Sequence, residues 1–252
     1  FRPEECSWDR EGHVWTMGET SFRRTTVDGH VHVDIDFDCE LTGVPDRLTG
    51  SLNLVGPLRQ EDGANLKDDR FDLSRTAGHT WEPIALGGAN AKLALTMGEW
   101  STALSGRAYH DRNGGKIPLQ QQGIRHWNWG RFAFPDRELV LYLVELENGS
   151  SEWTWLEVDQ AGACAFRPVE SVTHTRRKRS IYGPTWSQSI QVATADGVTV
   201  HVHQGHPIDN GPFYLRHFAT AEIDGYTAHG ISELVEPSRV DMAIHRPLVK
   251  MR

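Results

Sequence analysis

The sequence predicts an all-β protein, an antiparallel sandwich or barrel with few short helices. Two observations predict this class: turn signals containing Gly or Pro recur along the chain, and the segments between them are short and alternate between apolar and polar residues. No segment keeps the 3.6-residue period of a helix for more than about two turns. The turn signals are Asp28-Gly29, Gly56-Pro57, Asp62-Gly63, Gly87-Gly88, Asn113-Gly114, Asn148-Gly149, Asp196-Gly197, Asn210-Gly211-Pro212 and Asp224-Gly225.

The predicted strands follow in chain order. Residues 30–38 place Val31, Val33, Ile35 and Phe37 on one face and histidines and aspartates on the other. Residues 138–147 are apolar on both faces, as expected of a buried central strand. Residues 150–159 and 197–204 alternate again.

The chain length of 252 residues allows one large domain or two modest ones. No flexible linker is visible, and residues 118–130 lead from a turn-rich region into a new set of strands. We therefore predict two domains, residues 1–123 and 124–252, that pack tightly. A cleft between them is the expected ligand site.

Composition limits the function. The chain contains nine Trp, nine Phe and five Tyr, more Trp than packing alone requires, so some rings are expected to line a cavity. The net charge of −8 disfavours nucleic-acid binding. The one basic run, residues 176–179, is predicted to be a solvated strand end or loop, with binding of a phosphate or anionic substrate as the alternative.

The cysteines and the apolar segments bear on where the protein is located. Cys6, Cys39 and Cys164 are too few and too widely spaced for a disulfide framework or a metal site, which predicts a reducing, cytoplasmic location. No transmembrane span or signal peptide is recognisable. The chain begins with Phe1, so we expect that residues before it are missing or were removed. The oligomeric state stays open.

Residues 106–118, GRAYHDRNGGKIP, hold the main candidate for catalysis. Asn113-Gly114 is a preferred pair for a type I′ hairpin turn. On the strand before it, Tyr109 and Asp111 would share one face and His110 the other. Asp111 could serve only to bond the amides of that turn.

The alternative role for Asp111 is catalytic. A carboxyl group enclosed by aromatic rings is poorly solvated when charged, so its pKa rises and it can act as a general acid. An adjacent imidazole, His110, could hold it or relay a proton. Aromatic faces also stabilise a nearby cation by about 0.5–2 kcal/mol each. The rings that this part of the sequence supplies are Tyr109, Trp81, Trp100, Trp127 and Trp129.

These segments resemble a known family. The segments HTWEPIA, WSTALSGRAYHDRNGGKIPL and IRHWNWGRF are similar to the central signature of the carotenoid 1,2-hydratases, also called hydroxyneurosporene synthases, and the related AttH-like proteins. The matching residues are His79, Trp81, Pro83, Ile84, Ala85, Gly106, Tyr109, Asp111, Asn113, Gly115, Pro118, Leu119, Trp127, Trp129 and Arg131. Residues 211–217 and 229–239 resemble the family's C-terminal part, so the likeness spans roughly residues 48–252.

The resemblance implies two packed lipocalin-like β domains and an enzyme without cofactors. Its substrate would be a small hydrophobic, unsaturated molecule of the polyene or isoprenoid kind, with access from a membrane surface. Family hydratases protonate a terminal double bond, and water captures the tertiary cation. The catalytic residues would be Asp111, His110 and Tyr109. The substrate-binding residues would be Trp81, Trp100, Asn113, Trp127, Trp129, Arg131, Tyr214 and Glu233.

One departure from the family pattern concerns the shape of the site. The family often has Trp after the Asn, where this chain has Gly114. The loss of that ring suggests a wider or differently shaped pocket. Glu233, with His229, is either a second acid or an exposed strand carboxylate.

Two other functions stay open beside hydration. Related double-lipocalin folds also serve as cyclases, so a Diels–Alderase-type pericyclic cyclase is one alternative. A non-enzymatic carrier of a hydrophobic ligand is the other. No metal is expected, because the pairs His30/His32 and His201/His203 lack suitably spaced acids. The loops typical of hydrolases and nucleotide-binding enzymes are absent.

Overall fold

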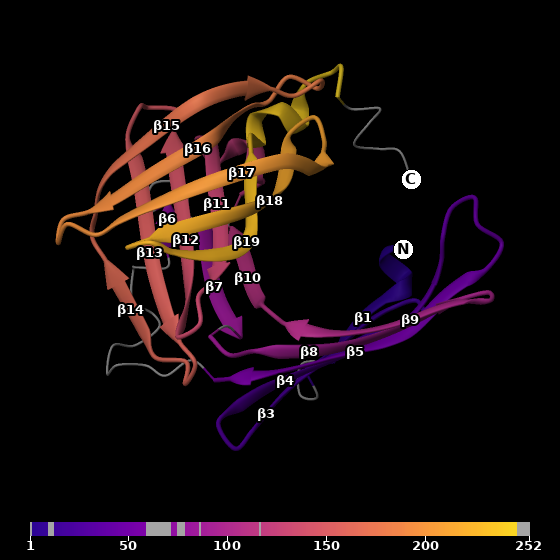
Figure 1. Ribbon diagram of the computed structural model, residues 1–252. Coiled ribbons are helices and arrows are strands. Elements are labelled where there is room, and N and C mark those ends of the chain that lie inside the picture. Colours follow the sequence, from indigo (N-terminus) through magenta and orange to yellow (C-terminus); the bar gives the residue numbers. More distant parts are fainter. Residues whose placement is uncertain are drawn as a thin grey trace.

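The computed structural model describes residues 2–9, 13–58, 72–74, 79–85, 87–115 and 117–245. The strands form three antiparallel sheets, of seven, three and nine strands (Figure 1). The described helices are short 3-10 turns, η1 (Pro3–Glu5), η3 (Leu119–Gln121) and η4 (Pro237–Asp241). The predicted all-β antiparallel class is therefore confirmed. None of the helices in the described segments is long and apolar enough to cross a membrane.

The seven-stranded sheet has the order β1-β2-β3-β4-β5-β8-β9. Its strands are β1 (Cys6–Asp9), β2 (Val14–Met17), β3 (Thr20–Val27), β4 (His30–Glu40), β5 (Arg47–Pro57), β8 (Asn90–Met97) and β9 (Trp100–Arg107). Asp28 and Gly29 have φ angles of 48° and 72° and join β3 to β4, as their turn chemistry predicts. Val31 and Val33 are buried on β4, which confirms the predicted apolar face.

The three-stranded sheet has the order β10-β7-β6, with β10 (His110–Gly115), β7 (His79–Ala85) and β6 (Asp72–Ser74). The predicted turn at Asn113-Gly114 is wrong. Both residues lie within β10 and pair with Trp81 and Thr80 of β7. Pairing with a distant strand overrides the local turn preference here, and the chain leaves β10 only after Gly115.

The nine-stranded sheet has the order β14-β13-β12-β11-β19-β18-β17-β16-β15. Its strands are β11 (Ile124–Ala133), β12 (Arg137–Leu146), β13 (Ser151–Asp159), β14 (Cys164–Arg167), β15 (Val169–Arg179), β16 (Thr185–Thr194), β17 (Thr199–Asn210), β18 (Tyr214–Ile223) and β19 (Tyr226–Val235). The two edge strands, β14 and β15, follow each other in the chain with Pro168 between them, so the sheet curls back on itself. β12 is buried along most of its length, as predicted for residues 138–147.

The curled sheet has a core on each face of β11–β13. Inside the curl, Phe132, Leu141 and Trp155 pack with apolar residues of β16–β19. On the opposite face, Trp127 and Tyr142 pack with Trp81 of the three-stranded sheet, which covers this face. Large apolar side chains on both faces explain why this part of the sequence reads as continuously hydrophobic.

The two halves of the chain are joined by specific contacts. Arg107 Nη1 donates to the carbonyl of Phe134 at 2.9 Å, and Arg131 Nη2 donates to the carbonyl of Ala108 at 2.8 Å. Gly87, with φ of +64°, lies so close to β13 that a Cβ atom would come 2.1 Å from the Asp159 carbonyl oxygen. Among the described strands, none before residue 124 pairs with one after it. We keep the division into residues 1–123 and 124–252 as a proposal that this pairing supports.

Candidate active site

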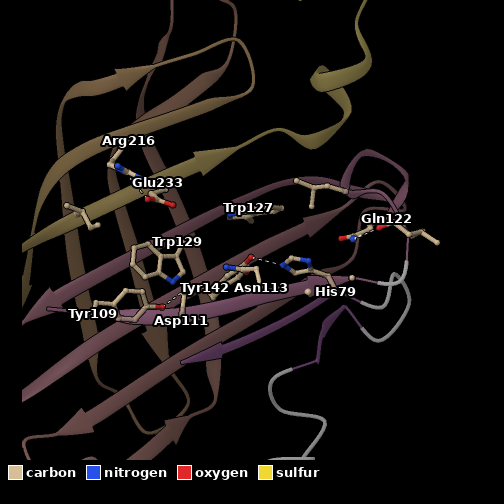
Figure 2. Close-up of a pocket in the computed structure, with 15 residues that line it drawn as sticks. His79, Tyr109, Asp111, Asn113, Gln122, Trp127, Trp129, Tyr142, Arg216 and Glu233 are labelled. Carbon is tan, nitrogen blue, oxygen red and sulfur yellow. Dashed lines mark hydrogen bonds and ion pairs between the residues drawn. The ribbon is translucent and has the colours of Figure 1, made fainter. Parts of the chain in front are cut away.

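A cavity of about 750 Å³ lies between the three-stranded sheet and the face of the nine-stranded sheet that this sheet covers. Its volume is within the range of small-molecule sites. Strands β7 and β10 form one side, and β11, β12, β18 and β19 form the other (Figure 2). Its lining residues are His79, Tyr109, Asp111, Asn113, Gly114, Gly115, Ile117, Leu119, Gln122, Trp127, Trp129, Tyr142, Arg216, Ile231 and Glu233.

Asp111 is held through one of its two carboxyl oxygens. Its Oδ2 accepts hydrogen bonds from Tyr109 Oη at 2.6 Å and from Trp81 Nε1 at 2.7 Å. Its Oδ1 makes no hydrogen bond to a residue in the described part of the chain, and Asp111 lines the cavity. Because Oδ2 already receives two donors, Oδ1 is the oxygen left to contact a ligand.

Strand geometry explains how these three side chains meet. Tyr109 and Asp111 are two residues apart and share a face, which confirms the prediction made from their spacing. Trp81 lies on the neighbouring strand β7, opposite Asn113. The register shifts between His110 and Asp111, where β7 contains Pro83. A proline has no N–H to donate, and such irregularities often aim a side chain at an active site.

The two tyrosines of the cavity keep their phenolic protons. Burial, and then the Asp111 carboxylate, raise the pKa of Tyr109 well above its ordinary value. Burial, with smaller effects from Asp111 and Glu233, raises the pKa of Tyr142. The Trp81 indole can only donate, and this fixes the donor in each hydrogen bond of the network. Trp81 donates to Tyr109 Oη at 3.1 Å, and Tyr109 in turn donates to Asp111.

Aromatic rings form the wall around Asp111. Tyr109 and Trp129 lie 5.3 Å apart between ring centroids. His79 stacks on Trp127 at 5.5 Å and its Nε2 lies 3.1 Å from Tyr142 Oη. A positive charge that forms in this space would face several π systems at once.

The β18–β19 side of the cavity is charged. Glu233 Oε1 accepts from Arg216 Nε at 3.0 Å, and Arg216 also pairs with Asp209 at 3.2 Å. Glu233 pairs in register with Trp129. Tyr214 packs beside Arg216, whose guanidinium is 5.4 Å from its ring centroid, and is not among the residues that line the cavity. Burial, and then Glu233, raise the pKa of Tyr214.

Besides Tyr214, three residues expected at the site lie elsewhere, and Trp81 bonds Asp111 without lining the cavity. His110 points to the other face of β10, 5.7 Å from the Phe22 ring, where burial lowers its pKa. Trp100 is 49% exposed at the start of β9, beside the turn from β8. Arg131 shares the face of Trp127 and Trp129 on β11 but lies beyond the cavity, where it forms a two-point ion pair with Glu138 at 2.6 and 3.0 Å. Its guanidinium also lies 5.3 Å from the Tyr109 ring centroid, so it supports that ring.

Gly114 does not widen the cavity in the way its sequence suggests. A Cβ atom at this position would lie 2.9 Å from Thr80 Oγ1. Thr80 alternates along β7 with His79 and Trp81, whose side chains face the cavity side. A side chain at position 114 would therefore point to the opposite face of the sheet.

Sequence reasoning missed Tyr142, His79 and Arg216 as cavity residues. Tyr142 is the one aromatic residue in the apolar segment 138–147. Because a buried tyrosine hydroxyl usually needs a polar partner, this position could have been recognised as a candidate. His79 was noted in the family pattern but not as a site residue. Arg216 gave no local signal, because its place follows from the pairing of β18 with β19.

A known protein family matches almost the whole chain. The model of a family described as carotenoid hydratase CrtC matches residues 9–252. The chain belongs to the carotenoid hydratase CrtC family. This confirms the family resemblance that the signature segments indicate.

Two curated relatives and one solved structure extend the comparison of this CrtC-family chain. A Chlorobaculum tepidum protein named hydroxyneurosporene dehydrogenase is 30% identical over 141 residues, 53% of this chain and 36% of the relative. The acyclic carotenoid 1,2-hydratase of Rhodobacter capsulatus is 24% identical over 182 residues, 71% of this chain and 60% of the relative. The chain thus matches less than two thirds of either relative's length. The crystal structure of an AttH-like protein from Nitrosomonas europaea has a TM-score of 0.63 at 16% identity, over 89% of this chain and 70% of that one, and shares the fold.

Proposed function

We propose that this CrtC-family protein is a hydratase that adds water to a carbon–carbon double bond of an apolar, isoprenoid-like substrate, with Asp111 as the general acid. One observation carries the proposal. The Asp111 carboxyl group is fixed through Oδ2 by Trp81 and Tyr109, while Oδ1 is left for a ligand in an aromatic cavity. The acyclic carotenoid named in the Rhodobacter capsulatus relative gives the substrate class to test first.

The first step is proton transfer from Asp111 Oδ1 to the less substituted carbon of the double bond. The π electrons form the new C–H bond, the O–H bond breaks, and the other carbon becomes a tertiary cation. The hydrogen bonds from Trp81 and Tyr109 to Oδ2 then stabilise the carboxylate left behind. General acid catalysis of this kind contributes about 10²–10⁴-fold to the rate.

The cation is stabilised by the aromatic wall. Trp127, Trp129 and Tyr142 line the same cavity as Asp111, and Trp129 packs against Tyr109. Each ring that faces the cation contributes about 0.5–2 kcal/mol. Trp127 and Trp129 carry no charge, and Tyr142 keeps its phenolic proton, so none of the three presents an anion to the cation.

Glu233 is suited to orient the water that captures the cation. Its carboxylate lines the cavity and is held by Arg216 Nε at 3.0 Å. A carboxylate accepts a hydrogen bond from water and turns the water oxygen toward the cation. After the C–O bond forms, one proton leaves the oxonium ion and returns to the Asp111 carboxylate, which restores the acid. The addition of water is redox-neutral, so the step balances without a cofactor.

Reaction in heavy water tests the proposal and separates it from its alternatives. We expect the wild-type protein, incubated with an acyclic carotenoid in D₂O, to yield a hydroxylated product with one carbon-bound deuterium per hydroxyl group. Mass spectrometry and NMR after back-exchange in H₂O measure this. A product that contains no carbon-bound deuterium would indicate a pericyclic cyclase, and substrate recovered unchanged would indicate a carrier.

A further inference from the structure

A second cavity, of about 340 Å³, lies at the η4 end of the nine-stranded sheet. Its walls include His126 and Asn128, which alternate along β11 with the Trp127 and Trp129 of the first cavity. The two cavities therefore lie on opposite faces of β11. The remaining lining residues are Arg125, His174, Arg177, Thr185, Trp186, Ser187, Leu234, Glu236, Ser238, Arg239 and Met242.

The three arginines of this cavity are engaged to different degrees. Arg239 already has partners within the protein, because its Nε donates to the Pro212 carbonyl at 2.6 Å and it pairs with Glu236 at 3.5 Å. Arg125 is only loosely paired, 3.6 Å from Glu145. Arg177 forms no hydrogen bond or ion pair with any residue that the structure describes. Its guanidinium is thus a cation at the cavity without a partner within that part of the chain.

Uncharged donors complete the lining. Asn128 is only 5% exposed, yet its amide has no hydrogen-bond partner among the described residues. Its amide atoms are not among the fully buried unpaired atoms of the described residues, so they are open to the cavity and can bond a ligand there. His174 Nδ1 lies 3.2 Å from Ser187 Oγ, so its Nε2 stays available.

The two imidazoles of the cavity are neutral near pH 7. Burial is the largest cause that lowers the pKa of His126 and of His174, and Arg177 lowers both further. Glu145 acts in the opposite direction on both. The other charged groups on this cavity are Arg125, Glu236 and Arg239.

We propose that this second cavity is a binding site for a phosphate-type oxyanion, with Arg177 as its main cationic ligand and Asn128, His126 and His174 as further donors. A guanidinium and several donors converging from different strands match the several oxygens of such an anion. The site is separate from Asp111, so the proposal does not depend on the hydratase function. The phosphate could belong to a soluble monoester or to a lipid headgroup, which share this chemistry.

Binding should be coupled to protonation of the histidines. A bound dianion favours the charged imidazolium, so affinity increases as the pH falls through the range in which His126 and His174 titrate. Sulfate is the appropriate probe for this coupling, because it stays a dianion over the whole range. We expect calorimetry to show tighter sulfate binding at pH 6 than at pH 8.

The test compares two neighbouring arginines. Arg177→Gln should weaken sulfate and inorganic phosphate binding at least 10-fold, whereas Arg176→Gln, on the same strand and exposed, should change it less than two-fold. Two further ligands distinguish a soluble phosphate monoester from a lipid headgroup. Glycerol 3-phosphate represents the monoester. Vesicles of phosphatidic acid in phosphatidylcholine, with phosphatidylcholine vesicles as the control, represent the headgroup. Arg177-dependent binding of either supports the site. Binding of neither, equal loss in both variants, or sulfate affinity independent of pH would overturn it.

Discussion

Replacing Asp111 with asparagine is expected to lower the rate of hydration by at least about 10²–10⁴-fold, the usual contribution of a general acid. The amide keeps the shape of the side chain and can still accept from Trp81 and Tyr109 through its oxygen. It has no acidic proton to give to a double bond. Turnover measured by product analysis, with binding followed through polyene absorbance, should therefore show lost kcat and retained affinity.

The control for this variant is Asp136→Asn. Asp136 has the same carboxyl side chain but is 70% exposed and pairs with Arg137 outside the cavity. We expect it to keep wild-type turnover and stability. Near-normal hydration by the Asp111→Asn protein would remove Asp111 from the mechanism. A parallel loss of substrate binding would mean that the residue shapes the cavity rather than the reaction.

The largest effect on stability is expected at Glu138. This carboxylate is 1% exposed and binds Arg131 through both oxygens, while Arg131 also holds the Ala108 carbonyl of the other half of the chain. Glu138→Gln leaves a guanidinium charge buried against a neutral amide. Removing one partner of such a pair costs about 3–5 kcal/mol, measured as the free energy of unfolding in urea.

An exposed ion pair provides the comparison. Asp38 binds Arg47 at 2.6 Å, but the two side chains are 40% and 42% exposed. Asp38→Asn is expected to lower the free energy of unfolding far less, because solvent screens the pair. If both variants lose similar amounts of stability, Arg131 and Glu138 do not form the strong buried ion pair described here. Glu138→Gln should also reduce turnover, since Arg131 supports the ring of Tyr109.

Much of the fold follows from local sequence, and its exceptions have a common cause. The turn at Asp28-Gly29, the alternation of β4 and the buried strand β12 were all predicted from their own residues. Asn113-Gly114 has equally good turn chemistry but lies within β10. What decides its conformation is pairing with β7, some thirty residues away in the chain, as the Trp81–Asn113 register shows. Local patterns carry no information about such pairing.

Some residues of the candidate site follow from the local sequence, and others depend on how distant strands pair. Tyr109 and Asp111 follow from strand alternation, and that same alternation directs His110 away from them. Arg131 matches the family pattern, yet its role depends on Glu138 of the adjacent strand. Tyr142 and Arg216 reach the cavity because β12 and β18 flank the β11–β19 pair in the sheet, an order that the sequence does not reveal.

A crystal structure of the Asp111→Asn protein with a bound acyclic carotenoid tests the central claim most directly. The variant holds the substrate without converting it. The account predicts the terminal double bond within about 3–3.5 Å of the amide at position 111, in the near-attack range, with Trp127 and Trp129 around it. A substrate end seated away from this side chain, or a polyene bound outside the cavity, would contradict it.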